Sequence, residues 1–221
     1  MQEELKPLLV TIITVFCIIC GYIIISPAGI IPELSINQSY GDAISSQISG
    51  TATVGQSFFS QDKNLREIDL LVSAPGGASQ NDVIFHLQEV DSRKEIVKKR
   101  LKASTFDFQN NRFYPISFGP IENSNNKTYT FYLESPDGIP HNAIAVYYNP
   151  KDVYGVGSMT IDSIPKEGDI VFKTYNLPKN MTAFDWLSTF VWRFSQDWIF
   201  AIFYILCLFL LVVGIYRFSE K

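Results

Sequence analysis

This chain of 221 residues has few of the side chains that most often build reactive sites. It contains only two histidines and three cysteines. Cys17, Cys20 and Cys207 all lie in apolar stretches near the two ends, so the region between them cannot form a disulfide. A zinc site needs three or four ligands, and neither histidine has a partner at ligand spacing. A histidine-dependent hydrolase and a disulfide-stapled domain are therefore both disfavoured.

An excess of basic residues is also missing. Lys and Arg total 18 against 22 for Asp and Glu, the formal net charge is -4, and the sequence pI is about 5.2. Nucleic-acid-binding proteins usually have a basic face and a high pI, so we expect no nucleic-acid partner. The sequence contains no phosphate-binding glycine loop and no nucleophile elbow. We therefore predict that the chain is not an enzyme and needs no cofactor.

Charge is absent from two long segments near the ends, 8–25 and 198–216. About 20 apolar residues in a helix cross the hydrocarbon core of a bilayer, where the backbone must satisfy its own hydrogen bonds. We predict transmembrane helices over 8–26 and 198–216, with cytoplasmic ends at 1–7 and 217–221. Cleavage of the first segment after Ala28 is the alternative. Its flank is not net positive and its apolar run is long, so we expect an uncleaved anchor.

The distribution of basic residues around these segments predicts the topology. Lys6 precedes the first segment, Arg217 and Lys221 follow the second, and no Lys or Arg lies between Ile25 and Lys63. The positive-inside rule then places both termini in the cytoplasm and the middle region outside the plasma membrane. Glycosylation sequons in that middle region begin at Asn37, Asn126 and Asn180.

All three tryptophans, Trp186, Trp192 and Trp198, lie close together beside the second apolar segment. Such clustering is typical of an aromatic belt at a membrane interface. Apolar residues also recur at three- or four-residue spacing from 184 to 198, which predicts an amphipathic interfacial helix over 182–197. Two alternatives stay open, because these residues could begin one long helix or form a docking surface for another membrane subunit.

The middle region, 35–177, alternates short apolar and polar runs separated by Gly, Pro, Asn and Asp. An apolar residue at every second position is typical of half-buried strands. Many short strands without a long helical pattern predict an antiparallel β-sandwich, and we expect a jelly-roll-like one. The predicted strands are 51–59, 67–73, 82–90, 95–102, 112–118, 127–134, 143–149, 158–162 and 169–175.

Several of these segments also carry a family resemblance: GQSF at 55–58, IDLL at 68–71, VIFHL at 83–87, YTFYLESPD at 129–137 and GDIVFKTY at 168–175. Together they resemble the small extracytoplasmic β-sandwich domain of bacterial and archaeal membrane glycosyltransferases and other envelope proteins. The resemblance implies a sandwich exposed at the cell envelope. It implies no sugar transfer, because this chain has no catalytic glycosyltransferase domain and only two predicted spans.

Three binding hypotheses follow from the middle region. A polar and aromatic strand face could bind glycan, although a sandwich could simply half-bury the same rings. Loop aspartates could hold a structural Ca²⁺, which takes oxygen ligands. The basic run 93–102 could contact anionic headgroups or a polyanion, or could protect an edge strand from pairing. The glycan face comprises His86, Gln88, Tyr132, Glu134 and Tyr147, and the calcium ligands are Asp137, Asp152 and Asp169.

The sequence thus predicts a non-enzymatic, membrane-anchored accessory protein. Its extracytoplasmic β-sandwich would bind an envelope glycan or a neighbouring membrane protein. The alternative is a structural or assembly subunit of a multi-subunit membrane enzyme or transport complex, whose spans and Trp-rich segment pack against partner helices. The expected partners are the lipid bilayer, other membrane-protein subunits and envelope glycans.

Overall fold

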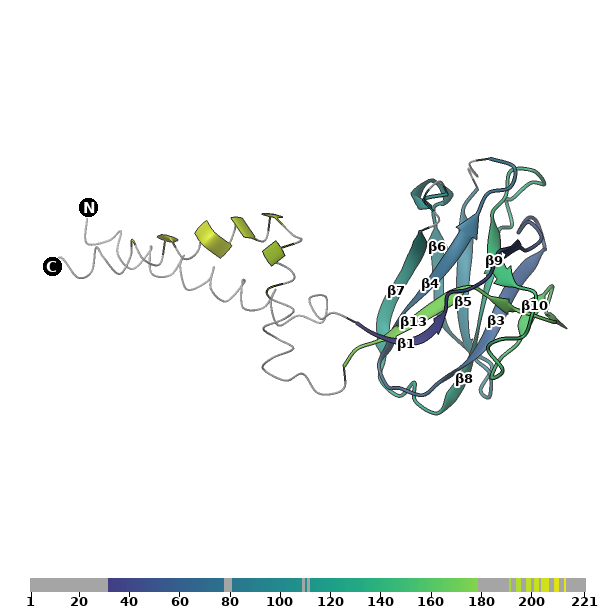
Figure 1. Cartoon of the computed structure of the whole chain (residues 1–221), viewed down its shortest axis with the longest axis horizontal. Coiled ribbons are helices and arrows are strands. Elements are labelled where there is room, and N and C mark those ends of the chain that lie inside the picture. Colours follow the sequence, from purple (N-terminus) through teal and green to yellow (C-terminus); the bar gives the residue numbers. More distant parts are fainter. Residues whose placement is uncertain are drawn as a thin grey trace. The chain divides into compact units, whose positions relative to one another are not determined.

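The computed structural model describes residues 32–77, 81–108, 110 and 112–178, and also positions 191, 194, 195, 198, 199, 201, 202, 204–206, 209, 210 and 213. The chain divides into two compact units. One is Pro32–Lys179, which we call the β domain, and the other consists of Met1–Ile31 with Asn180–Lys221. Figure 1 shows the β domain as strands arranged in layers.

The described part of the β domain contains thirteen strands and one short 3₁₀ helix, η2 (Ala103–Thr105). The strands are β1 (Glu33–Gln38), β2 (Ala43–Ile44), β3 (Thr53–Ser60), β4 (Leu65–Ser73), β5 (Val83–Glu89), β6 (Lys94–Leu101), β7 (Phe113–Ile121), β8 (Lys127–Glu134), β9 (Ala145–Asn149), β10 (Met159–Ile161), β11 (Ile164–Lys166), β12 (Asp169–Ile170) and β13 (Phe172–Asn176).

These strands form two sheets in which every described pair is antiparallel. The seven-stranded sheet has the order β1-β13-β4-β9-β12, with β2 on β9 and β7 on β4. The six-stranded sheet has the order β11-β10-β3-β8-β5-β6. The prediction of a mostly β fold with antiparallel sheets is confirmed, and the arrangement is that of a β-sandwich.

The alternation that predicted the strands is visible in their burial. In β8, Tyr129, Phe131 and Leu133 are buried, while the residues between them are only partly buried. The structure gives β8 the bounds that the sequence predicted, 127–134. The predicted strands omit β1, β2 and β11. These strands are short or at an edge, and β11 is exposed throughout, so they lack the buried alternate positions that make a strand recognisable.

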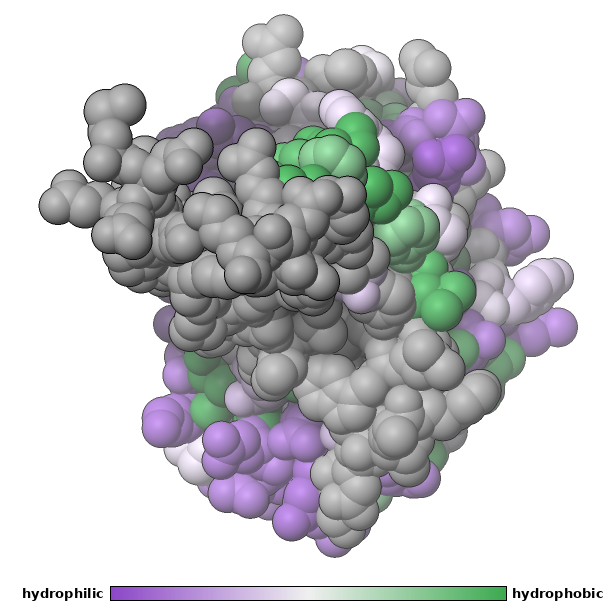
Figure 2. All heavy atoms as spheres, turned by 90° about the vertical axis from the view of Figure 1, so that its left-hand side faces the viewer, coloured by the Kyte–Doolittle hydropathy of each residue, from purple (hydrophilic) through white to green (hydrophobic). Residues whose placement is uncertain are grey.

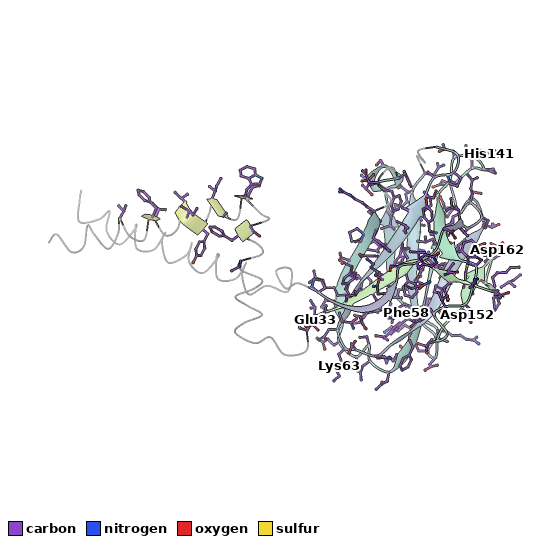
Figure 3. All side chains as sticks on the ribbon, viewed as in Figure 1. Glu33, Phe58, Lys63, His141, Asp152 and Asp162 are labelled. Atoms are coloured by element: carbon purple, nitrogen blue, oxygen red, sulfur yellow. The ribbon has the colours of Figure 1, made fainter. Side chains whose placement is uncertain are left out.

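Phenylalanines from both sheets meet in the core, among many buried Ile, Leu and Val side chains. Phe58, Phe85 and Phe131 come from β3, β5 and β8 of the six-stranded sheet, and Phe172 comes from β13 of the other. Each is 0% exposed. The Phe172 ring lies 5.5 Å from that of Phe131 and 5.9 Å from that of Phe58. Figure 3 shows Phe58 inside the domain, whereas His141 lies at its periphery.

The described residues of the second unit are all helical and mostly apolar. No helix among them is long and apolar enough to cross a membrane. The predicted span 8–26 lies outside the described residues, as do Trp186 and Trp192, while Trp198 is helical and 70% exposed.

The rings of Phe194 and Tyr204 meet edge to face, with centroids 6.2 Å apart.

Candidate functional site

The outer face of the six-stranded sheet carries a compact aromatic and acidic cluster. His86 in β5 and Tyr132 in β8 are directly opposite each other in the antiparallel pair. Their rings stack with centroids 4.3 Å apart and an interplanar angle of 3°. Both side chains point away from the core, because the alternate residues Phe85 and Phe131 fill it. The pairing therefore places two flat rings against each other on the outside of the sheet.

Two glutamates hold the edge of the imidazole ring. His86 Nδ1 lies 2.5 Å from Glu95 Oε1, and His86 Nε2 lies 3.1 Å from Glu134 Oε1. The His86 side chain is only 4% exposed, whereas those of Glu95 and Glu134 are 40% and 29% exposed. Both ring nitrogens are thus occupied while the carboxylates still reach solvent. We call His86, Glu95, Tyr132 and Glu134 the ring cluster.

Tyr132 remains a neutral phenol at physiological pH. Burial, followed by the negative charges of Glu95 and Glu134, raises the pKa of its hydroxyl above the ordinary value of 10. A neutral phenol keeps its hydrogen-bond donor. The cluster thus offers one O–H donor and two partly exposed carboxylate acceptors beside a flat ring.

The carboxylate pair resembles the catalytic pair of glycoside hydrolases in residue type only. Those enzymes place a substrate bond between two carboxyl groups. Here the imidazole of His86 fills the space between Glu95 and Glu134 and contacts both. The position between the two acids, where such enzymes hold the substrate bond, is therefore taken by the His86 ring.

The structure brings together four of the five residues predicted for the glycan face. Gln88 lies on β5 two residues beyond His86, on the same side of the strand, and pairs with Thr130. Tyr147 does not join this face. It lies in β9 of the seven-stranded sheet, where it pairs with Ile44. The reason is topological, because the chain passes from one sheet to the other between β8 and β9.

Glu95 belongs to the ring cluster but was not among the predicted site residues. It lies in β6, the hairpin partner of β5, and pairs with Gln88. The register of that hairpin shifts between Leu87 and Gln88. A bulge adds one residue to one strand and changes which side chains share a face. The sequence can predict that β5 and β6 pair as a hairpin. It cannot predict the register shift that turns Glu95 toward His86.

The three predicted calcium ligands are not brought together. Among the described residues, no group of three or more His, Cys, Asp or Glu side chains is arranged so that it could hold a metal ion. Asp137 and Asp152 are exposed, whereas Asp169 in β12 is 0% exposed. Figure 3 shows Asp152 at the outside of the domain. A calcium site thus stays a prediction that no preformed group of these side chains supports.

Asp169 instead joins the two sheets. Its Oδ2 accepts hydrogen bonds from the backbone N–H groups of Val153 and Tyr154, at 2.7 and 2.8 Å. Its Oδ1 accepts one from Gln56 Nε2 at 3.1 Å, and Gln56 Oε1 accepts the N–H of Ile170 at 3.0 Å. Gln56 is also 0% exposed. Both carboxylate oxygens of Asp169 are therefore engaged by N–H donors, as expected for a structural acid.

A second acidic group lies on the outer face of the seven-stranded sheet. Asp69 and Glu67 share one face of β4, Ser117 donates a hydrogen bond to Glu67, and Asp69 is only 8% exposed. Burial, reinforced by the charge of Glu67, raises the pKa of Asp69 to about 6 against the opposing effects of a Tyr175 hydrogen bond and Lys173. Asp69 thus titrates close to neutral pH.

A cavity of about 280 Å³ opens elsewhere, where short strands of the two sheets approach each other. Its lining includes Tyr148 of β9, Met159 and Ile161 of β10, and Lys166 of β11. None of the predicted site residues lines it. Among the residues coloured in Figure 2, hydrophilic ones cover much of the visible surface.

Comparisons with known proteins identify no family. No protein-family model matches the chain, and no curated protein matches it. A solved structure of a cycloisomaltooligosaccharide glucanotransferase from Paenibacillus sp., complexed with cycloisomaltoheptaose, overlays on 52% of this chain with 11% identity and a TM-score of 0.29. The overlay covers 16% of that enzyme. A TM-score this low does not establish a shared fold.

Proposed function

We propose that this chain is a non-enzymatic accessory protein that binds a cell-envelope glycan on the outer face of its six-stranded sheet. The observation that carries the proposal is the ring cluster. The ring of Tyr132 lies flat against that of His86, and two partly exposed carboxylates contact the His86 ring. Sugars are bound by flat aromatic rings with hydroxyl-recognising polar groups beside them, and a preorganised arrangement reduces the entropy lost on binding.

The two histidines support a binding role over a catalytic one. His86 is enclosed by Glu95, Glu134 and Tyr132. His141 is exposed, and its backbone N–H donates to the Gln47 side chain. A nucleophile–base pair would require a histidine against Ser or Cys, and neither of these contacts supplies one. The proposed activity is therefore recognition without bond cleavage.

The proposed cellular setting follows the sequence. We place a jelly-roll-like β domain outside the plasma membrane, held by two apolar spans, in line with the resemblance to envelope glycosyltransferase domains. Large apolar side chains of the second unit are exposed to more than half of their surface, including Val191, Ile202 and Phe209. Such side chains are buried by lipid or by a protein partner.

The same exposed residues favour a second candidate function, that of a structural subunit in a membrane complex. In that case the second unit would pack against partner helices, and the β domain would contribute little affinity of its own. Mild-detergent purification separates the two candidates. Co-purifying chains that depend on the second unit would favour the subunit role, and a clean monomer that binds glycan would favour the accessory role.

Glycan binding is tested with the full-length protein in nanodiscs and a panel of envelope polysaccharides. Tyr132→Ala removes the ring from the cluster, and we expect affinity to fall by about tenfold, since an aromatic contact contributes about 1 kcal/mol or more. Tyr132→Phe keeps the stack and should bind nearly as well. Tyr147→Ala is the matched control, because Tyr147 lies in the other sheet.

Folding of each variant is checked by its thermal midpoint, so that loss of binding is not confused with loss of structure. Equal loss of affinity in Tyr132→Ala and Tyr147→Ala would refute the assignment of the ring cluster. Failure of the wild-type protein to bind any polysaccharide in the panel would refute glycan binding itself and leave the subunit role as the better candidate.

A further inference from the structure

The most basic segment of the chain forms an exposed edge of the same sheet. Residues 93–102 contain six Lys or Arg and a single acid, Glu95, although the whole chain has a net charge of -4. β6 is the last strand of the six-stranded sheet, and Lys94, Lys98, Lys99 and Arg100 are all exposed. A third of the 18 basic residues thus lies along one sheet edge.

The strand register aligns this edge with the ring cluster. Lys98 pairs with His86, His86 with Tyr132, and Tyr132 with Gly55. These residues therefore form one row across four neighbouring strands, and Thr160 of β10 extends it by pairing with Gly55. Neighbouring strands are about 4.8 Å apart, so the Lys98 backbone lies about 10 Å from that of Tyr132.

Gly55, next to Tyr132 in this row, lies in a tightly packed position. A Cβ atom at Gly55 would lie 2.6 Å from the Phe131 carbonyl oxygen, 2.9 Å from Tyr132 Cβ and 3.0 Å from Thr160 Oγ1. Glycine at position 55 therefore leaves no side chain on β3 between Tyr132 and Thr160. The row runs from a cation, through stacked rings, to a hydroxyl.

The neighbouring charges leave the basic end of the row net positive. Arg100 forms an exposed ion pair with Asp82 at 3.3 Å. From Asp82 to Lys102 the sequence has six Lys or Arg and four Asp or Glu.

We infer that the ligand of the six-stranded sheet is an anionic glycan, whose carboxylate, phosphate or sulfate groups contact Lys98 and the neighbouring cations of β6 while a sugar ring lies on Tyr132. This inference rests on the proposed function and names the class of its ligand. A polymer lying across the strands spans both features, because the row places them about two strand spacings apart.

The observations favour a polysaccharide over a lipid surface. A protein that docks on anionic headgroups commonly adds apolar side chains that enter the interface. In β6, Ile96 and Val97 are half-buried, and the exposed large apolar side chains of the described residues include none from this strand. A basic edge in line with a stacked ring matches a charged sugar polymer better.

The test uses the full-length protein in nanodiscs of neutral lipid and pairs of polymers that differ only in charge. Polygalacturonate is compared with its methyl ester, and dextran sulfate with dextran, by biolayer interferometry at low and at physiological salt. The expected result is tighter binding of one acidic polymer than of its neutral partner, with affinity that falls as salt rises.

The variants locate the charge effect. Lys98→Gln should weaken acidic-polymer binding about two- to fivefold, as expected for one exposed charge. The same change at Lys98 and Lys102 together should weaken it more. Lys63→Gln is the matched control, since Lys63 is exposed in the turn between β3 and β4, away from β6. Tyr132→Ala should weaken binding of acidic polymer as well.

Each contrary outcome has a distinct meaning. Equal binding of acidic and neutral polymers would overturn the anionic class and leave glycan binding intact. Binding of none of the four polymers, together with no binding in the envelope panel, would overturn both. Three outcomes would overturn the proposed row as the binding surface. One is an equal loss of affinity in Lys63→Gln and Lys98→Gln, and another is binding only to anionic vesicles. The third is loss of affinity in the lysine variants without loss in Tyr132→Ala.

Discussion

The buried contact between Gln56 and Asp169 offers a sharp test of how the two sheets are joined. Asp169→Asn changes one atom type without changing side-chain size. An asparagine oxygen can still accept from the N–H groups of Val153 and Tyr154. Its NH₂ group then faces the NH₂ group of Gln56, which already donates to Asp169 in the wild-type protein. Two donors would meet in a site from which water is excluded.

The magnitude follows from these contacts. Losing one buried hydrogen bond and leaving a donor unpaired costs about 1–3 kcal/mol. The two backbone donors to Asp169 also lose a charged acceptor, which costs about 1 kcal/mol more because charge-assisted bonds are roughly twice as strong. We expect Asp169→Asn to lower the free energy of unfolding by about 2–4 kcal/mol. For a domain of this size that is about 6–12 °C in thermal midpoint.

The assay is thermal unfolding of the full-length protein followed by tyrosine near-UV circular dichroism. All tryptophans lie outside the β domain, so tryptophan fluorescence would not report on it. The exposed Asp152 lies in the loop that Asp169 holds. Asp152→Asn is therefore the control and should change stability by about 0.5 kcal/mol or less.

A double variant distinguishes pairing from a general effect of buried polarity. Gln56→Glu with Asp169→Asn moves the carboxylate to the opposite sheet and restores one donor facing one acceptor. The double variant should be more stable than the sum of the two single changes predicts, by about 1–3 kcal/mol. Strict additivity, or a midpoint for Asp169→Asn within about 1 °C of wild type, would show that this contact does not join the sheets.

Three further predictions concern other residues. Because burial raises the pKa of Asp69 to about 6 from an ordinary 3.8, the folded state holds this proton more tightly, so its contribution to stability is full below pH 3.8 and is lost as pH rises to 6. Urea unfolding should show Asp69→Asn gaining about 1–2 kcal/mol over wild type between pH 4 and pH 7, allowing for solvent screening; a constant difference would contradict this. Gly55→Ala should cost about 1–3 kcal/mol by overpacking against Phe131 and Tyr132 and should weaken polysaccharide binding, and unchanged binding would show that the Tyr132 position is not critical. EDTA should leave the thermal midpoint unchanged, since N–H donors already occupy both oxygens of Asp169, and a marked drop would point to a metal site.

Local alternation was enough to predict most of the strands, because it reports burial directly. The run from Lys127 to Glu134 has apolar residues at every second position, and β8 has the predicted bounds. The separation of β12 from β13 at Val171 was not predictable in this way. Val171 is buried, but its N–H donates to Tyr147 and its carbonyl accepts from Leu71, so the chain changes partners there. Partner choice depends on residues far apart in sequence.

The candidate site also contains residues that local alternation predicted and residues that depend on long-range pairing. Alternation placed His86 and Gln88 on one face of a strand, and Tyr132 and Glu134 on one face of another. Local alternation could not add Glu95 to this face, because its position depends on a register shift. It also could not exclude Tyr147 from the face, because that depends on where the chain crosses between the sheets. The ring cluster is therefore a product of pairing, and its residue types alone did not define it.

By itself, the sequence determined that the middle of this chain is a disulfide-free, mostly β domain, because hydrophobic periodicity is a local property that each segment carries. It also determined which side chains of a strand lie on the same side. Only the tertiary structure decided which strands became neighbours, that Asp169 serves Gln56 and two backbone N–H groups, and that Lys98, His86 and Tyr132 form one row. Such contacts are set by long-range pairing and register, for which a one-residue shift turns a side chain to the opposite face.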